Sequence, residues 1–404
     1  MTPSQNQNFQ MNEHLERIKV LSAGVSSLIL VMGIARFSYT PMLPLMQQQA
    51  GLGIAGAGWL AAINYVGYIG GAYMASLISD LVLKDRLYRI GLVLAIISTL
   101  MMGMTNNFQV WALSRFIAGL SSAAGMLFGT GLILNWLFRH NHRSELGIHF
   151  SGIGLGIAGV SVAVAVTIPS LNWSQQWYAF AALGCLLLIP ALGWLPPPDR
   201  STLTKTGQPM IDNPPGTIFL RLFMAAYFCM GMGYVVSATF IVAIVDHMPE
   251  LTGQGTLVFL VIGLAAAPTC IAWDFIARRT GDLNALILAS SLEIIGILLP
   301  VYFGGLTAAL VGALLFGGTV MGIVSLVLTM AGHYYPTRPA KMMGKMTLSY
   351  GAAQIFGPAF TGWLATRFGS YTTGLYMAAG IMIAGTLILI ILKTVEKQGS
   401  TVPS

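Results

Sequence analysis

The chain has 404 residues, of which 55% are hydrophobic and only 8% are charged, and its net charge is +7 at pH 7. Because a soluble protein carries roughly 25% charged residues, this composition excludes a soluble domain and predicts an all-α polytopic membrane protein. The positive charge does not indicate nucleic-acid binding, since the basic residues fall in short loops and not on one soluble face. The three cysteines lie inside apolar segments, so we expect neither a disulfide framework nor a metal site.

Twelve apolar segments follow one another along the chain, and each is long enough to cross the hydrocarbon core of a bilayer. We therefore predict twelve transmembrane helices with short connections. The segments of the first half lie at about 20–46, 56–79, 88–105, 108–137, 145–168 and 174–195. Those of the second half lie at about 217–246, 254–277, 282–303, 307–333, 341–365 and 371–393.

One long polar stretch, bracketed by prolines, separates the two sets of segments. Such a composition is typical of a flexible linker. The two sets look duplicated, because Ser38-x-Thr40 in the first segment recurs as Ser237-x-Thr239 in the seventh. Parallel repeats of this kind build many secondary transporters. The sequence thus predicts two six-helix pseudo-repeats at 1–195 and 217–404, joined by a cytoplasmic linker at 196–216.

The basic residues predict the orientation. Most of the 20 Lys and Arg residues fall in loops that share one side of the membrane, whereas Arg367 falls on the other. Because cytoplasmic loops are enriched in Lys and Arg, we expect a multi-pass protein of the cell inner (plasma) membrane with both termini in the cytoplasm.

The first segment carries a cation at membrane depth. Arg36 lies within the stretch Gly33–Met46, and no acidic residue occurs between Val20 and Met46. Burying a guanidinium there costs roughly 2.5–3.5 kcal/mol on insertion scales. Pro41 and Pro44 follow and should loosen the helix. An unpaired cation beside a weakened helix predicts a binding site, unless Arg36 extends to the membrane surface or pairs with a carboxylate of another helix.

The fourth segment carries a second cation, Arg115. It shares one helix face with the small residues Gly119 and Ala123, so it should point into the bundle. Two buried arginines favour an anionic ligand, such as a carboxylate, through charge-assisted hydrogen bonds. The alternative is that Arg115 binds backbone carbonyls of a broken first helix and acts as a structural clamp.

Polar and aromatic residues on other segments are candidates for the same cavity. Tyr39 follows Arg36, and Asn64 in the second segment shares a polar face with Tyr65 and Tyr68. From the second half, Tyr234 could approach the cavity together with Tyr350 and Gln354. The alternative for each tyrosine is an anchor at the membrane interface.

Glu293 is the one acidic residue in the middle of a predicted span. A carboxyl group at that depth suggests proton coupling. The alternative is a protonated side chain hydrogen-bonded within its own half. Enzyme motifs such as HExxH, G-x-S-x-G and phosphate-binding loops do not occur. We therefore expect no enzyme activity, no cofactor and no metal.

At these residues the chain resembles the major facilitator superfamily over essentially its whole length. The pattern Arg115, Gly119 and Ala123 resembles the fourth-helix motif of that superfamily. Four stretches resemble its YbfB/YjiJ-type branch: GIARFSYTPMLPLM, FSGIGLGIAG, GYVVSATF and LSYGAAQIFGPAFTGWLA. The resemblance implies the twelve-helix major facilitator fold, a monomer, and a cytoplasmic gate formed by Asp80, Arg86, Asp274 and Arg278. The gating motif departs from the superfamily pattern, with Ser76 in place of the usual glycine.

Together these features predict a secondary active transporter of a small solute, with an organic anion bound by Arg36 and Arg115 during alternating access. A first alternative is an exporter of amphipathic compounds, of the multidrug efflux type, in which the arginines are structural. A second alternative is a membrane sensor that does not transport.

Overall fold

The computed structural model describes residues 3–78, 80–140, 146–198, 215–246, 248, 251–334 and 339–399, and all its regular elements in these ranges are helices. In the first half they are α1 (Pro3–Leu28), η1 (Ile29–Phe37), α2 (Tyr39–Ala50), α3 (Ile54–Leu77), α4 (Leu81–Met104), α5 (Phe108–Ala123), η2 (Ala124–Phe128), α6 (Gly129–Arg139), α7 (Leu146–Thr167) and α8 (Trp173–Gly193). In the second half they are α9 (Thr217–Asp246), α10 (Gly255–Ala266), α11 (Thr269–Thr280), α12 (Asp282–Phe303), α13 (Gly305–Tyr334), α14 (Pro339–Phe368) and α15 (Thr372–Gly399).

These helices correspond to the predicted segments. The first segment is the continuous run α1–η1–α2, the fourth is α5–η2–α6, and the eighth is the pair α10 and α11. The eighth was expected as one straight span but is bent by 49° between its two helices. Pro268 lies in the break, where its ring and missing N–H interrupt the helical hydrogen bonds.

Helix length and apolarity fit a membrane location. Within the described residues, nine helical spans are long and apolar enough to cross a bilayer, or ten when α10 and α11 are taken as one. The remaining long helices, α3 and α14, have 24 and 30 residues, which is ample length at about 1.5 Å per residue. Both contain several glycine and polar residues, and they pack against each other. Of the predicted linker, residues 199–214 lie outside the described residues.

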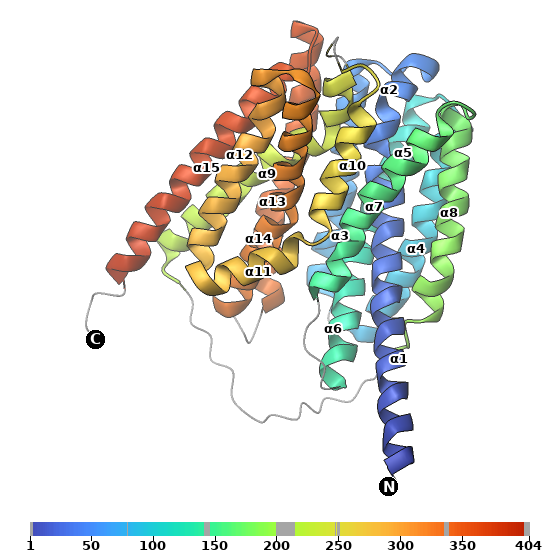
Figure 1. The fold of residues 1–404 in the computed structure, drawn as a ribbon, viewed down its shortest axis with the longest axis vertical. Helices are drawn as coiled ribbons and strands as arrows, with labels where there is room; N and C mark the ends of the chain where they lie inside the picture. The colour runs from blue at the N-terminus through green and yellow to red at the C-terminus, as the bar shows by residue number, and fades with distance from the viewer. Residues whose placement is uncertain are drawn as a thin grey trace.

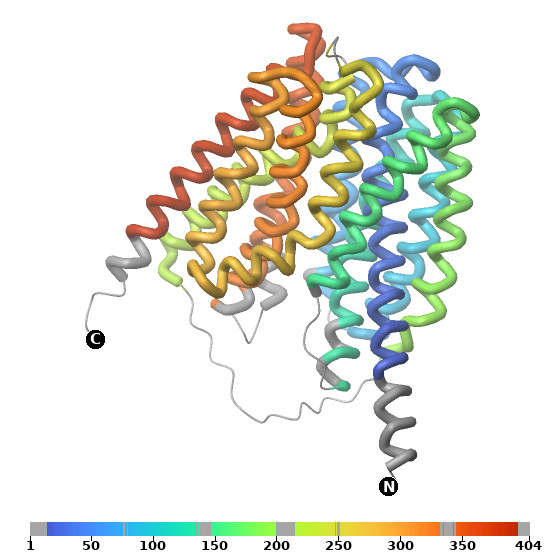
Figure 2. Tube along the Cα trace, in the orientation of Figure 1, coloured from blue at the N-terminus to red at the C-terminus, as the bar shows by residue number. Residues whose placement is uncertain are grey.

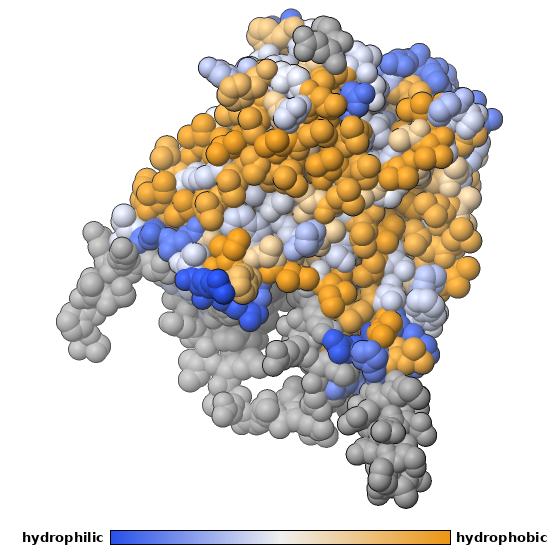
Figure 3. Space-filling model, in the orientation of Figure 1, coloured by the Kyte–Doolittle hydropathy of each residue, from blue (hydrophilic) through white to orange (hydrophobic). Residues whose placement is uncertain are grey.

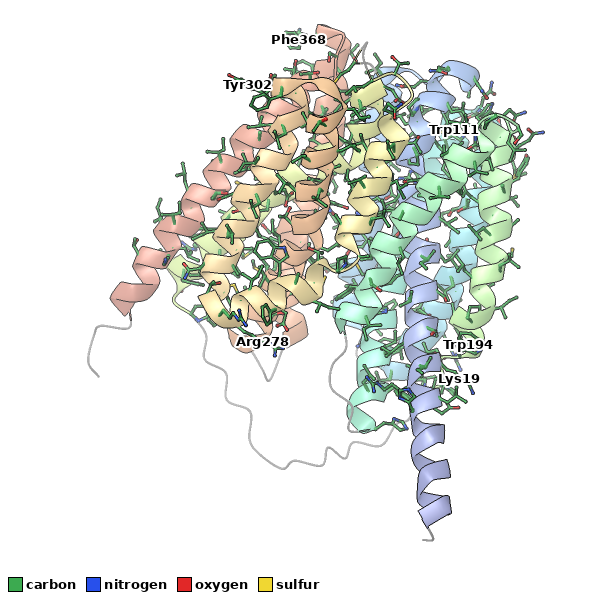
Figure 4. All side chains as sticks on the ribbon, viewed as in Figure 1. Lys19, Trp111, Trp194, Arg278, Tyr302 and Phe368 are labelled. Atoms are coloured by element: carbon green, nitrogen blue, oxygen red, sulfur yellow. The ribbon has the colours of Figure 1, made fainter. Side chains whose placement is uncertain are left out.

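The surface of the protein also fits a bilayer. A broad hydrophobic zone covers the middle of the face in Figure 3, with hydrophilic residues toward both ends. Figure 4 places Lys19, Trp194 and Arg278 at one end, and Trp111, Tyr302 and Phe368 toward the other. Exposed aromatic residues such as Trp194 and Tyr302 are typical of the two interfaces of a membrane.

The two halves lie side by side, with both chain ends directed toward the same end of the bundle (Figures 1 and 2). Helices α3 and α14 meet at glycines: a Cβ at Gly58 would lie 2.5 Å from the carbonyl oxygen of Pro358. Helices α7 and α10 meet in the same way, since a Cβ at Gly154 would lie 2.4 Å from the nitrogen of Ala267. At these two points the backbones of the two halves approach so closely that there is no room for a side chain.

Candidate functional site

The first transmembrane segment, α1–η1–α2, becomes a π-helix at η1, where the buried Arg36 lies. Over η1 the hydrogen bonds run from residue i+5 to residue i, as in Ser38 N to Gly33 O at 2.9 Å. Pro41 has no N–H for the Phe37 carbonyl, which is its α-helical partner. The loosening that we expected at the prolines therefore occurs before them. Single π-helical turns are frequent at functional sites because they re-aim side chains and release carbonyls.

Arg36, the last but one residue of η1, is only 4% exposed. Its Cζ lies 4.5 Å from the ring centres of both Tyr65 and Tyr68 on α3, so ring faces stabilise its charge. Its Nε has no hydrogen-bond partner. Within the described residues no carboxylate lies within ion-pair distance of Arg36. The alternatives of surface extension and of pairing with an acid are therefore not supported.

Arg115 on α5 is 3% exposed and holds the backbone of η1. Its Nη1 donates to the carbonyl oxygens of Ala35 at 3.1 Å and of Arg36 at 3.3 Å. The hydroxyl of Ser122, farther along α5, donates to the Val31 carbonyl at 2.9 Å. These donors satisfy carbonyls of the π-helix, so Arg115 acts as the clamp that we considered as the alternative. Its Nε is still without a partner, and its charge still acts on the site.

Tyr39 and Asn64 lie beside the two arginines. The Cζ of Arg115 lies 4.6 Å above the Tyr39 ring, whose hydroxyl donates to the Ala57 carbonyl at 2.9 Å. Asn64 Nδ2 donates to the carbonyl of Arg115 at 2.9 Å, while its Oδ1 has no partner. The structure thus brings together the four site residues predicted in the first half.

A small cavity of about 10 Å³ lies at this cluster. Its walls include Arg36, Tyr39, Asn64 and Arg115 from the first half, and Ala238 and Thr239 from the second. Thr40 closes one side by donating to the Ala238 carbonyl at 2.8 Å. A space of this size accommodates about one water molecule. The protein is therefore closed around the arginines.

The two site residues predicted in the second half differ in their placement. Tyr234 is buried and stacks on Tyr350 with ring centres 5.7 Å apart. Tyr234 also interacts electrostatically with Tyr65 and Arg36, so it faces the arginine cluster. Gln354 is 3% exposed and its Oε1 has no partner. It does not line the cavity between the arginines.

Glu293 on α12 is 1% exposed and lies within the second half. Its Oε2 accepts from the Thr319 hydroxyl at 3.5 Å, a long hydrogen bond, and its Oε1 has no partner. The same hydroxyl lies closer, at 2.9 Å, to the Leu315 carbonyl. Glu293 also interacts electrostatically with Tyr350. This environment is the one that the structural alternative predicts, and a coupled proton remains a prediction.

The predicted gating residues lie at the start of α4 and within α11. Asp80 accepts from the Val82 N–H at 2.7 Å and caps α4, whereas Arg86 is exposed. Asp274 and Arg278 form an exposed pair at 2.6 Å, the kind that contributes little to stability.

Sequence reasoning missed the pair that joins α4 to α8. Arg89 Nε lies 2.9 Å from the Asp85 carboxylate. Two further nitrogens of Arg89 donate at 3.2 Å to the carbonyls of Leu192 and Leu195, at the end of α8. A cation is favourable at a helix C-terminus. The i, i+4 spacing of Asp85 and Arg89 could have predicted the pair, but not its partner helix.

A larger pocket of about 420 Å³ lies between the halves, away from the arginines. Its walls are Pro41, Pro44, Leu45, Gln47 and Gln48 of α2, with Ile168, Asp246, Thr252, Gly253 and Thr256. Gln47 donates to the Tyr371 hydroxyl at 3.1 Å near this pocket. Helix α2, which lines it, lies at the end of the bundle opposite to the chain termini in Figure 1. The position of the pocket suggests a vestibule rather than the binding site itself.

Three relatives give the context of this site. The chain is 25% identical over 390 residues to an uncharacterised MFS-type transporter, YceJ, of Bacillus subtilis (strain 168), covering 93% of this chain and 97% of that protein. It is 23% identical over 352 residues to an MFS-type transporter of Gibberella moniliformis, covering 84% and 83%. It is 30% identical to the quinolone resistance protein NorA of Staphylococcus aureus, but over only 168 residues, 40% of this chain and 42% of NorA.

Solved structures support the same fold. Two crystal structures of the nucleoside transporter NupG superpose with TM-scores of 0.73 and 0.68 at 14% identity, each covering 92% of this chain. They cover 99% and 98% of the respective NupG chains. At that identity the likeness concerns the fold alone. Residues 28–390 match the family model described as "Uncharacterised MFS-type transporter YbfB". The chain therefore belongs to the YbfB-type family of major facilitator superfamily transporters.

Proposed function

We propose that this transporter moves a small organic anion across the membrane by alternating access. The observation that carries the proposal is Arg36, a guanidinium that is 4% exposed, has an unpartnered Nε and has no carboxylate partner among the described residues. Ring faces and a side-chain hydrogen bond with Tyr65 stabilise its charge, but its Nε is left without an acceptor. A carboxylate is the ligand that best supplies both a negative charge and an acceptor.

The two arginines have different roles in this proposal. Arg36 binds the anionic group of the solute, while Arg115 fixes η1 through the carbonyls of Ala35 and Arg36 and adds positive potential. Asn64 and Tyr234, which lie around the same guanidinium, contribute further polar contacts. When the halves separate, the cavity enlarges enough to admit the solute. Tyr39 and Gln354 complete the set of substrate-binding residues.

Orientation and coupling complete the proposal. We place both termini in the cytoplasm and the protein in the inner membrane as a monomer. In support, Lys19 and Arg278 lie toward the end of the bundle to which the chain termini point (Figure 4). Glu293 carries a coupled proton, and Asp80, Arg86, Asp274 and Arg278 act in the cytoplasmic gate. The halves rock at the glycine contacts Gly58–Pro358 and Gly154–Ala267.

The test is solute counterflow in proteoliposomes that contain the purified protein. Labelled organic acids, amines and neutral solutes of similar size would be compared one at a time. We expect counterflow with one or more acids, and its loss when the carboxylate is replaced by an amide. Counterflow that is equal for an acid and its amide would contradict the anion proposal.

A second candidate function is export of amphipathic compounds. The aromatic rings around the centre favour it, since Tyr227 and Tyr234 both stack on Tyr350. The partial similarity to NorA, a quinolone resistance protein, points the same way. This function predicts transport of chemically diverse amphipathic solutes, with no need for a charge, that survives Arg36→Gln. The anion function predicts loss of transport in that variant.

A further inference from the structure

The charges at the centre of this protein are not balanced within the described residues. Arg36 and Arg115 are 4% and 3% exposed and close enough to repel each other electrostatically. Their neighbours are ring faces and backbone carbonyls, which are neutral groups. Neutral dipoles lower the cost of a buried charge but do not cancel it. A bound counter-ion would therefore lower the electrostatic energy of these two buried like charges even when no solute is bound.

The cavity between the arginines has room for a single small particle. Its volume is about 10 Å³, and both arginines line it. The Nε atoms of both arginines are buried donors without a partner. One acceptor, Asn64 Oδ1, is also unpartnered at this cavity. The space excludes a carboxylate-bearing solute in this closed state but fits a water molecule or, with a small shift of the walls, a monatomic anion.

We infer that the closed protein holds one monovalent halide-sized anion, such as chloride, between Arg36 and Arg115. The two Nε–H groups donate to it, and its charge offsets one of the two guanidinium charges. The inference rests on the proposed function, because the carboxylate of the solute would take the place of this anion when the cavity opens. Since the closed cavity admits only the small anion, halide binding favours the closed state and competes with the organic anion.

The first experiment is thermal unfolding of the purified full-length protein in detergent, with chloride compared with methanesulfonate at constant sodium concentration. Methanesulfonate is too large for the cavity. We expect chloride and bromide to raise the unfolding midpoint saturably, by about 2 °C or more. The same comparison with Arg36→Gln should show no difference between the salts. The matched control is Arg367→Gln, which changes an exposed arginine and should respond to chloride as the wild type does. Equal midpoints of the wild-type protein in both salts would overturn the inference in favour of a bound water.

A second experiment needs no variant, in case Arg36→Gln fails to fold. Equilibrium binding of radioactive chloride to the wild-type protein should saturate near one ion per chain and be displaced by bromide but not by methanesulfonate. Absence of saturable binding would overturn the inference. Organic-acid counterflow without halide binding would leave the proposed function standing alone. Halide binding without any organic-acid counterflow would support the halide site and contradict the proposed function.

Discussion

The guanidinium of Arg115 donates to the main-chain carbonyl of Arg36 at 3.3 Å, so one buried arginine holds the backbone that carries the other. Both are almost completely buried, and the sequence predicted that both bind the anion, with a structural clamp as the alternative for Arg115. The contact separates their roles. Arg115 donates to two carbonyls of the π-helix, and Arg36 lines the cavity and has an unpartnered Nε.

The first prediction follows from that separation. In methanesulfonate, without a bound halide, Arg36→Gln should leave the unfolding midpoint unchanged or raise it, because it removes a buried charge that has no counter-ion. It should weaken binding of the transported acid by about one to two decades, since a charge-assisted hydrogen bond contributes roughly 1.5–3 kcal/mol. Arg115→Gln should instead destabilise the protein by about 1–3 kcal/mol, because it removes the hydrogen bonds from Arg115 to two carbonyls of η1.

Thermal unfolding and counterflow affinity, measured on the same preparations, check this prediction. Arg36→Lys should restore affinity only in part, since lysine keeps the charge but lacks the planar donor geometry. Equal losses of stability in the two glutamine variants would mean that both arginines are structural.

Sequence reasoning predicted the fold well because a bilayer imposes strong rules on composition. Long apolar segments and clustered basic loops are visible without any knowledge of packing. Two local features could not be predicted in this way. The π-helix at Ile29–Phe37 changes hydrogen bonding without changing apolar periodicity. Pro268 marks the place of the bend in the eighth segment, but not its angle of 49°.

The candidate site was predicted as a set of residues but not as a set of contacts. Asn64 and Tyr234 were expected near the arginines, and both lie there. The contact of Arg36 with the ring faces of Tyr65 and Tyr68 depends on the position of α3 beside η1. The spacing of residues on one helix does not predict which helix packs against it. Tyr234 and Gln354 are buried like the others, but neither lines the small cavity.

The second prediction concerns these rings. Tyr65→Phe keeps a ring face over Arg36 and should change counterflow affinity by less than about threefold. Tyr65→Leu removes the face, which is worth about 1–2 kcal/mol at a desolvated site, and should lower the yield of folded protein or the affinity by about tenfold. Size-exclusion chromatography and counterflow measure the two quantities. A Phe variant as impaired as the Leu variant would show that the hydroxyl, not the ring face, matters.

The third prediction concerns topology. In a background without the three native cysteines, Asn106→Cys lies in the exposed α4–α5 connection and Gly216→Cys lies just before α9. Because basic residues crowd the side that carries the linker, a membrane-impermeant maleimide should label Asn106→Cys in intact cells. It should label Gly216→Cys only after permeabilisation. Labelling of both from one side would contradict the predicted arrangement of the spans.

The fourth prediction concerns Glu293. If its carboxyl carries the coupled proton, Glu293→Gln should abolish accumulation driven by a proton gradient and leave counterflow intact, because counterflow needs no net proton movement. Thr319→Val is the matched control, since it removes the hydrogen-bond donor but keeps the carboxyl. Unchanged accumulation in Glu293→Gln would assign this residue to packing within the second half.

The last prediction uses two glycines on one helix. A Cβ at Gly154 would lie 2.4 Å from the nitrogen of Ala267 and 2.6 Å from the carbonyl oxygen of Gly263, both in the opposite half. A Cβ at Gly159, five residues farther along α7, would meet nothing within 4 Å. Both alanine variants gain a similar helix propensity of about 1 kcal/mol, so only the contact between the halves distinguishes them.

We therefore expect Gly154→Ala to prevent the close approach of α7 and α10 and to slow counterflow by at least about tenfold. Gly159→Ala should transport at the wild-type rate. Because the atoms met at Gly154 belong to the backbone, no side chain can move aside to relieve the contact. The measurement is the initial rate of counterflow at matched protein density in the vesicles. Equal rates in the two variants would mean that transport does not require the α7–α10 contact seen here.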